Sequence, residues 1–241
     1  MKLAFISDIH GNAAALDAVL EDIGGKAVDR IYVLGDLCYR GPEPKRALDR
    51  VRSLRTEVIK GNADEWVVRG VRPGEVPEQA IGMMNRERDW TLARLDADDV
   101  AYLNGLPQSL RLQFEGVSIS AFHATPDSLF EIVPPFAADE QIQAKLMTAE
   151  AADIYIYGHI HKPYIRYLDG KVVINTGSVG LPFDGMTKAS YAIVEVEQGS
   201  IRTSLERVAF PAEGVIRQYE EAQYPNAEMM ASVIRNASVK L

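Results

Sequence analysis

The chain of 241 residues carries 26 Lys and Arg against 34 Asp and Glu, a formal net charge of −8. This acidic balance argues against strong binding of duplex nucleic acid or of an anionic membrane surface. Apolar residues make up 47% of the chain, which excludes a disordered protein. The single cysteine, Cys38, excludes an internal disulfide, and no apolar run is long enough to span a membrane. We therefore expect one domain, residues 1–241, in the cytoplasm.

The first sixty residues alternate strand and helix patterns. Each strand pattern is a short apolar run, and the helix patterns place apolar residues three and four positions apart. The distance between successive strand ends is close to that of a strand–helix–strand unit, which predicts a parallel sheet with right-handed crossovers. The predicted strands are 2–6, 30–34 and 57–60; one predicted helix lies between its cap Asn12 and Gly24, and the other between Pro42 and Leu54.

The charged segment that follows breaks this alternation. It is helical in pieces and too long for a simple crossover, so we expect a helical insertion at about 65–105 over the edge of the sheet. The mixed charges of 86–99 predict a solvated helix face. Trp66 and Trp90 are expected to pack locally, with a platform that stacks a nucleobase as the alternative.

The rest of the sequence mixes hairpins and helices, which completes an α/β pattern. Asp-Gly or Glu-Gly pairs and similar turn residues separate short apolar strands in three places. The predicted hairpins pair 109–113 with 117–122, 164–168 with 172–175, and 189–196 with 201–208; a further strand is 153–157, and the helices are 139–149, 212–222 and 226–237.

All four histidines closely follow predicted strands, as do two aspartates and one asparagine. Ligands of an open α/β sheet bind just outside the carboxyl ends of its strands, so these side chains are expected at one rim. Any one of these histidines alone is best explained as an ordinary hydrogen-bonded residue, but four of them beside carboxylates favour a metal site. The candidate ligands are Asp8, His10, Asp36, Asn62, His123, His159 and His161.

The composition and spacing of this set favour two metal ions. Imidazole with carboxylate suits Mn, Fe, Zn, Co or Ni better than Ca or Mg. Seven ligands are too many for one such ion and suit two ions that share a bridging carboxylate. Residues two apart in an extended chain point the same way, so Asp8 and His10 are expected to reach one ion together. His159 and His161 are expected to reach one ion each.

In their order along the chain, these residues resemble the calcineurin-like metallophosphoesterase family. The matching stretches are Asp8-Ile9-His10, Gly35-Asp36, Gly61-Asn62, His123 and the Gly-His-Ile-His of 158–161. Further motifs are similar to those of the family's bacterial and archaeal phosphodiesterase-type branch, and they occupy 7–12, 35–42, 175–180 and 189–193.

This resemblance implies a four-layer α/β/β/α sandwich with two divalent metal ions. It implies that Asp8, His10 and His161 hold the first ion. It implies that Asn62, His123 and His159 hold the second, with Asp36 as the bridge. The implied nucleophile is a hydroxide between the two ions, with catalytic roles for Asp36 and Asn62 and a supporting one for Asp64. Manganese is the expected metal, and Fe, Zn, Co and Ni stay as alternatives.

One departure from the family pattern bears on the substrate. Many family members have a histidine after Gly-Asn that helps the leaving group depart, but this sequence has Ala63, followed by Asp64. We therefore expect a phosphodiesterase or a nucleotide-anhydride hydrolase, acting on a small phosphate ester, rather than a protein phosphatase. Thr176 replaces a common proline, and the stretch 181–184 lacks a common arginine. Tyr39 and Arg40, just after Asp36, are candidate substrate contacts.

Two other functions stay open at this point. A non-catalytic metal-binding scaffold for protein interactions is favoured by Ala63 and disfavoured by the complete ligand set. A nuclease is disfavoured by the net charge of −8. The sequence leaves the oligomeric state open.

Overall fold

The first of two sheets contains the N-terminal strand at its centre. The computed structural model describes residues 1–148 and 151–238. The order in this sheet is β2-β1-β8-β9, with β1 and β2 parallel and β8 antiparallel to both β1 and β9. The strands are β1 (Lys2–Ile6), β2 (Arg30–Val33), β8 (Ala189–Glu197) and β9 (Ser200–Val208).

The second sheet has a parallel centre and antiparallel edges. Its order is β3-β4-β5-β7-β6, and β4, β5 and β7 run parallel. The edge strands β3 and β6 pair antiparallel with their chain neighbours, which confirms the predicted hairpins. The strands are β3 (Ser109–Phe114), β4 (Val117–Phe122), β5 (Ile154–Tyr157), β6 (Tyr164–Leu168) and β7 (Lys171–Asn175).

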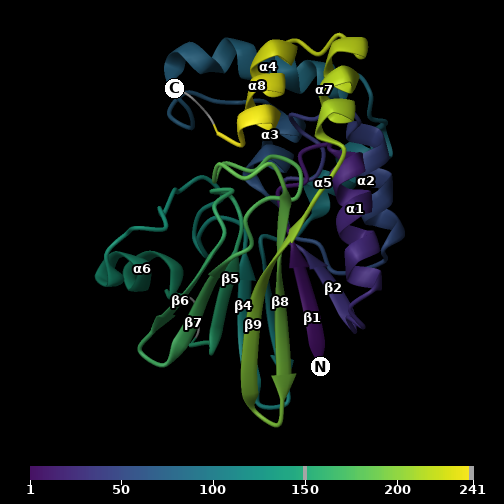
Figure 1. The fold of residues 1–241 in the computed structure, drawn as a ribbon. Coiled ribbons are helices and arrows are strands. Elements are labelled where there is room, and N and C mark those ends of the chain that lie inside the picture. The colour runs from purple at the N-terminus through teal and green to yellow at the C-terminus, as the bar shows by residue number, and fades with distance from the viewer. Residues whose placement is uncertain (149–150, 239–241) are drawn as a thin grey trace.

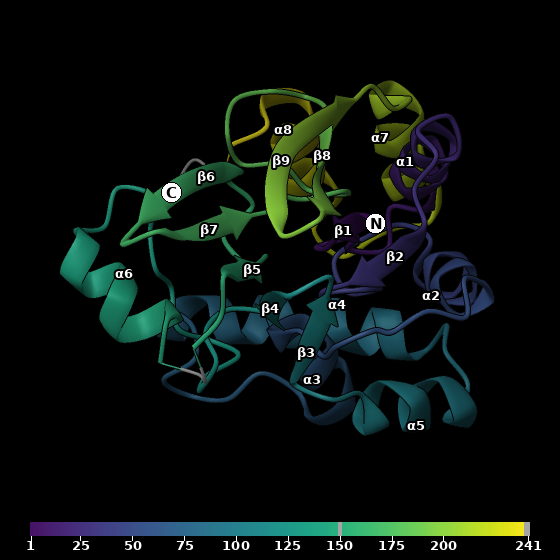
Figure 2. The ribbon, with the colours of Figure 1, turned by 90° about the horizontal axis from the view of Figure 1, so that it is seen from below.

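The two sheets pack face to face, with helices on both outer faces (Figure 2). Successive side chains of β1 point to opposite faces of the sheet, and both faces are apolar. Leu3 and Phe5 join the core between the sheets, while Ala4 and Ile6 pack against helices. Helices α1 (Ala13–Gly24) and α2 (Pro44–Ser53) cover the first sheet, and α6 (Asp139–Leu146) covers the second. These layers confirm the expected α/β/β/α sandwich.

Further helices complete the described part of the chain, namely α3 (Asn62–Arg69), α4 (Glu78–Leu92), α5 (Ala97–Gly105), α7 (Ala212–Glu221) and α8 (Ala227–Asn236). Helices α3, α4, α7 and α8 lie at the end of the sheets opposite the N-terminus (Figure 1). Trp90 packs with the C-terminal helix pair, and Trp66 lies in the core, where its ring contacts Tyr39 and Phe130. Among the described residues, no helix is both long and apolar enough to cross a membrane. That 65–105 is an insertion within a single domain stays a prediction.

The predicted strand 57–60 is shorter than expected and forms only an isolated parallel bridge between Val33 and Val58. The Val33 N–H donates to the carbonyl of Glu57, and the Ile59 N–H donates to that of Val33. The pairing ends there, because the Lys60 N–H donates instead to the carbonyl of Pro107 at 2.7 Å. The predicted helix 139–149 ends at Leu146, and its residue 149 lies outside the described residues.

The solvated face predicted for 86–99 is wrong at two positions. Glu87 and Asp99 are both 0% exposed. Asp99 accepts hydrogen bonds from Lys45 and Arg52 of α2, and Glu87 accepts one from Arg40. Their burial is possible because cations from outside the segment pair with them, which charge patterning within the segment does not reveal.

Asn12 joins the start of α1 to a distant loop. Its Oδ1 accepts from the N–H of Ala15, and its Nδ2 donates to the carbonyl of Gly180, both at 3.0 Å. We expect Asn12→Ala to lower the free energy of unfolding by about 1–3 kcal/mol, because it removes the cap and leaves a buried carbonyl unpaired. Urea unfolding measures the change. Asn104→Ala, on an exposed face of α5, is the control, and an equal loss in both variants would contradict the role given to Asn12.

Candidate metal centre

The seven candidate ligands gather where the carboxyl ends of both sheets meet. Asp8 and His10 follow β1, Asp36 follows β2, and Asn62 is the first residue of α3. The three remaining histidines come from the second sheet. His123 follows β4, and His159 and His161 follow β5.

One group of four side chains lies at the first sheet's side of this junction. The Nε2 atoms of His10 and His161 are 3.1 Å apart, and His161 Nε2 lies 3.1 Å from Oδ1 of Asp8. Oδ2 of Asp36 lies 3.5 Å from Nε2 of His10. One ligand atom from each of Asp8, His10, Asp36 and His161 lies within 4.8 Å of the others, and all four residues are buried.

A second group lies around the amide of Asn62. Oδ1 of Asn62 is 2.9 Å from Nε2 of His123 and 2.8 Å from Nδ1 of His159. Oδ1 of Asp36 lies 3.4 Å from Nε2 of His123. Asp36 therefore turns one carboxylate oxygen toward each group.

Backbone carbonyls fix which nitrogen of three histidines faces the cluster. Nδ1 of His10 lies 2.9 Å from the carbonyl of Tyr39, Nδ1 of His123 lies 2.7 Å from that of Leu34, and Nδ1 of His161 lies 2.5 Å from that of Leu181. A carbonyl only accepts, so each Nδ1 carries a proton and each ring turns Nε2 toward the cluster. Such second partners are typical of metal-ligating histidines.

The donor atoms fit a metal ion. With Nδ1 of each ring bonded to a carbonyl, Nε2 of His10 and Nε2 of His161 face each other at 3.1 Å, a pair of nitrogens that a shared cation would satisfy. Nε2 of His159 is buried and has no hydrogen-bond partner among the described residues. Nitrogen and carboxylate donors without thiolate suit borderline divalent ions.

Burial and charge set the protonation of the cluster. Burial lowers the pKa of His10 to about 4, and burial together with the charge of His123 lowers the pKa of His159 to about 4. Burial opposes the charge of His123, but the Asp36 carboxylate raises its pKa to about 10. Burial likewise opposes ionisation of Asp36, yet the charges of His123 and His10 hold its pKa well below its usual range. At neutral pH the centre thus offers an ionised Asp36 carboxylate and neutral imidazoles at His10 and His159, while His123 carries a proton on both ring nitrogens.

The backbone at the ligands is not extended, contrary to the expectation for the two-residue spacings. Residues other than glycine rarely adopt positive φ, and such strained positions cluster at functional sites. The tight turns bring Asp8 and His10 to the same group, while His159 and His161 face different groups. Positive φ values occur at Asp8 (54°), His10 (48°), Asp36 (57°), Arg40 (69°), His159 (66°) and His161 (55°).

Two glycines of the motifs leave space for the carboxylates. A Cβ at Gly61 would collide with the Asp36 carboxylate, and a Cβ at Gly158 would collide with that of Asp8. Gly61 and Gly158 are therefore required by close packing against the ligands, and any side chain there would displace a carboxylate oxygen.

Asp64 lies behind the cluster rather than in it. Its Oδ2 accepts from the backbone N–H of Asp36 and of Gly61 at 2.8 Å, and its Oδ1 accepts from that of Leu37 at 2.9 Å. Burial and the charge of Asp36 raise the pKa of Asp64 to about 7, against these hydrogen bonds. Asp64 thus ties the loop after β2 to the start of α3.

The two candidate substrate contacts differ in where their side chains lie. The hydroxyl of Tyr39 donates to the carbonyl of Met84 at 2.9 Å, so this fully buried ring points into α4 and offers only its backbone carbonyl to the cluster. The side chain of Arg40 is 21% exposed, and its Nε donates to Glu87 at 3.2 Å. Sequence patterns gave no sign of Glu87, because charge alternation made it one of many helix charges.

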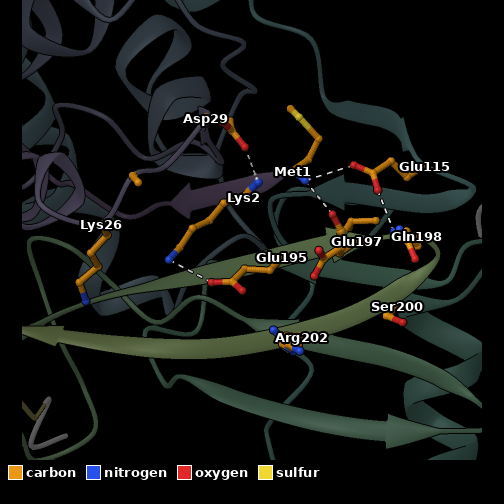
Figure 3. A pocket seen from close by; sticks show the side chains of 12 residues that line it. Met1, Lys2, Lys26, Asp29, Glu115, Glu195, Glu197, Gln198, Ser200 and Arg202 are labelled. Atoms are coloured by element: carbon orange, nitrogen blue, oxygen red, sulfur yellow. Dashed lines mark hydrogen bonds and ion pairs between the residues drawn. The ribbon is translucent and has the colours of Figure 1, made fainter.

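A polar pocket of about 650 Å³ lies at the opposite end of the sheets (Figure 3). Its lining residues include the start of β1 and the turn between β8 and β9, and none of the candidate ligands. Two of its cations are paired within the lining, since the Met1 ammonium lies 3.2 Å from Glu115 and Lys2 Nζ lies 3.0 Å from Glu195. This pocket is separate from the metal centre and offers no excess of charge to a phosphate.

Comparison with known proteins identifies the family. Residues 1–199 match the calcineurin-like phosphoesterase superfamily domain. The chain belongs to this family. The uncharacterized protein MJ0912 of Methanocaldococcus jannaschii is 29% identical over 214 residues, 80% of this chain and 82% of that protein. The phosphodiesterase YfcE of Escherichia coli is 24% identical over 205 residues, 81% of this chain and 88% of YfcE.

Two further similarities concern the fold and a part of the sequence of this calcineurin-like phosphoesterase. The crystal structure of a metallophosphoesterase from Sphaerobacter thermophilus superposes with a TM-score of 0.80 at 27% identity, over 98% of this chain and 99% of that one. A symmetrical bis(5'-nucleosyl)-tetraphosphatase of Baumannia cicadellinicola is 33% identical over 102 residues, 41% of this chain and 33% of that enzyme.

The position of Asp64 predicts a role in metal affinity. We expect Asp64→Asn to weaken Mn²⁺ binding about 10–100-fold. The amide NH₂ would replace an accepting oxygen and face a backbone N–H, so one hydrogen bond is lost and the loop of Asp36 shifts. Isothermal titration with Mn²⁺ measures the affinity. Asp153→Asn is the control, because Asp153 also accepts from a backbone N–H, that of Ser118, outside the cluster. Unchanged Mn²⁺ affinity in Asp64→Asn would show that its carboxylate does not position Asp36.

Proposed function

We propose that this protein is a metal-dependent phosphoesterase that hydrolyses small phosphodiesters or nucleotide anhydrides. The position of Asp36 between two histidine groups carries this proposal, since its two oxygens face His10 on one side and His123 on the other. A carboxylate placed in this way suits two divalent ions a few ångströms apart.

The side chains divide into two sets that would each hold one ion. Asp8, His10 and His161 form the first set, and Asp36 is shared by both. Asn62, His123 and His159 form the second. The ions, when bound, supply an activated water and positive charge for the phosphoryl oxygens. Manganese is the proposed metal, with Fe, Zn, Co or Ni as alternatives for the same donors.

The protein's own residues limit which substrates react well. Each of the four histidines lies in the cluster, and Ala63 stands where a proton donor for the leaving group would be expected. Asp64 does not replace it, because its two oxygens accept three backbone N–H groups. Substrates with good leaving groups should therefore be hydrolysed fastest. The names of the relatives, a phosphodiesterase and a tetraphosphatase, support diesters and nucleotide anhydrides.

One supporting feature concerns where the reaction takes place. Cys38 is buried and free, which suits a reducing compartment such as the cytoplasm.

A non-catalytic scaffold, the second candidate, is favoured by Ala63. It leaves unexplained why four histidines and two aspartates are held together with fixed ring orientations.

Metal analysis tests the two-ion centre. We expect about two Mn²⁺ per chain, hydrolysis of bis-p-nitrophenyl phosphate that chelation abolishes, and a loss of activity of about a hundredfold or more in Asp36→Asn. The reason is that removing the shared charge leaves two cations repelling each other. Asp153→Asn serves as the control and should keep both metals. One ion per fully loaded, active chain would sink the two-ion proposal, and two ions without hydrolysis of any ester would favour the scaffold.

Because a proton donor for the leaving group is missing, we expect the rate of hydrolysis to depend strongly on the leaving group. Across a series of aryl phosphodiesters, we expect the rate to fall steeply as the pKa of the leaving phenol rises, because a general acid worth about 10²–10⁴-fold is absent. Phosphoserine peptides should react poorly. The same series with Asp64→Asn is the control, and its slope should match the wild type. A shallow wild-type slope would show that another group already supplies the proton.

A further inference from the structure

The carboxylate of Glu87 is buried beside the loop that carries Asp36. Glu87 belongs to α4 and is 0% exposed. Its Oε2 accepts from the Tyr39 hydroxyl at 3.3 Å and from Nε of Arg40 at 3.2 Å, and its Oε1 accepts from Nδ2 of Asn226 at 3.2 Å. Three separate parts of the chain therefore meet at this carboxylate.

Stability alone does not account for this arrangement. A buried carboxylate is costly unless it is paired, and Arg40 supplies the charge that pairs with Glu87. Replacing a buried ion pair by apolar residues of similar volume is often neutral or stabilising. The pair of Glu87 and Arg40 is therefore better explained by what it holds in place.

The backbone of Arg40 is fixed as tightly as that of the ligands. Arg40 has a φ of 69°, in the left-handed region shared by five of the candidate ligands. Its carbonyl accepts from the hydroxyl of Tyr219 in α7 at 2.7 Å. The preceding carbonyl, of Tyr39, accepts from Nδ1 of His10. Arg40 is thus joined through one peptide unit to a histidine of the metal centre.

The two terminal amino groups of the Arg40 guanidinium are available as hydrogen-bond donors. Glu87 occupies Nε, and neither terminal amino group has a hydrogen-bond partner among the described residues. The side chain is 21% exposed, so these groups lie within reach of solvent. A guanidinium edge with two free N–H donors matches the oxygens of a phosphate group.

We propose that Glu87 is a positioning residue that holds Nε of Arg40, so that the terminal amino groups of Arg40 bind a phosphate oxygen of the substrate. This inference rests on the proposed phosphoesterase function. It assigns to α4, and to Tyr219 and Asn226 of the C-terminal helical segment, the task of orienting a substrate contact.

A double-mutant cycle tests the coupling of the two residues. With Mn²⁺-loaded protein and bis-p-nitrophenyl phosphate, we expect Glu87→Gln to raise KM about tenfold with little change in kcat, as expected when ground-state and transition-state binding are lost equally. Arg40→Ala should raise KM at least as much. In the Arg40→Ala background, Glu87→Gln should have no further effect, because the group that it positions is gone.

Asp99→Asn is the matched control. Asp99 is a buried carboxylate of the same charged segment, paired with Lys45 and Arg52 instead of Arg40. The Asp99→Asn variant should keep the KM of the wild type even if its midpoint of thermal unfolding falls. If Glu87→Gln does not fold, Tyr219→Phe replaces it, because loss of the bond to the Arg40 carbonyl should raise KM in the same direction.

Binding of inorganic phosphate separates this inference from the proposed function. Calorimetry with Mn²⁺-loaded protein should show phosphate affinity reduced about tenfold in Glu87→Gln and no further in the double variant. Additive losses, an unchanged KM and phosphate affinity in Glu87→Gln, or an equal loss in Asp99→Asn would overturn the inference. A wild type that binds phosphate but hydrolyses no ester would refute the proposed function alone, and one that binds no phosphate would refute the inference.

Discussion

The carboxylate of Asp36 is the group on which the arrangement of the site depends. It is buried, it lies near a second buried carboxylate, Asp64, and it is stabilised by donors from several elements. Its Oδ1 accepts from the N–H of Ala63 in the first turn of α3, where the helix dipole favours negative charge. Asp64 in turn accepts from the N–H of Asp36, so the anion and its loop are held from both sides. This explains why a glycine without a side chain, Gly61, must lie against Asp36.

The packing of the two sheets determines how far apart the two histidine groups lie. The carboxyl end of β1 and β2 supplies Asp8, His10 and Asp36, whereas β4 and β5 supply the other three histidines. The apolar core between the sheets, with Phe5 and Tyr32 stacked within it, therefore sets the distances inside the cluster. A change in that core acts on the metal centre without altering a ligand.

Sequence reasoning succeeds here where a signal is local and fails where it depends on tertiary contacts. Polar residues at strand ends and turn pairs such as Asp169-Gly170 are local signals, and they predicted the gathering of the ligands and the hairpins. The carbonyl partners of the histidines carry no residue signal, because every residue has a carbonyl. The burial of Glu87 depends on Arg40, forty-seven positions earlier. Glu87 shares a helix face with the buried Met84 and Thr91, but its charge led to a prediction of exposure.

The candidate metal ligands and Arg40 are held by different parts of the fold. The strand ends hold the candidate metal ligands in strained turns, and these turns tolerate little change because glycines and carboxylates are in contact there. Arg40 is held instead by α4, by Tyr219 of α7 and, through Glu87, by Asn226. In the proposed phosphoesterase the residues that would hold the ions thus come from the strand ends, and the groups that would orient the phosphate come from the helices. Such a division would let the helical side change with the ester while the centre stays the same.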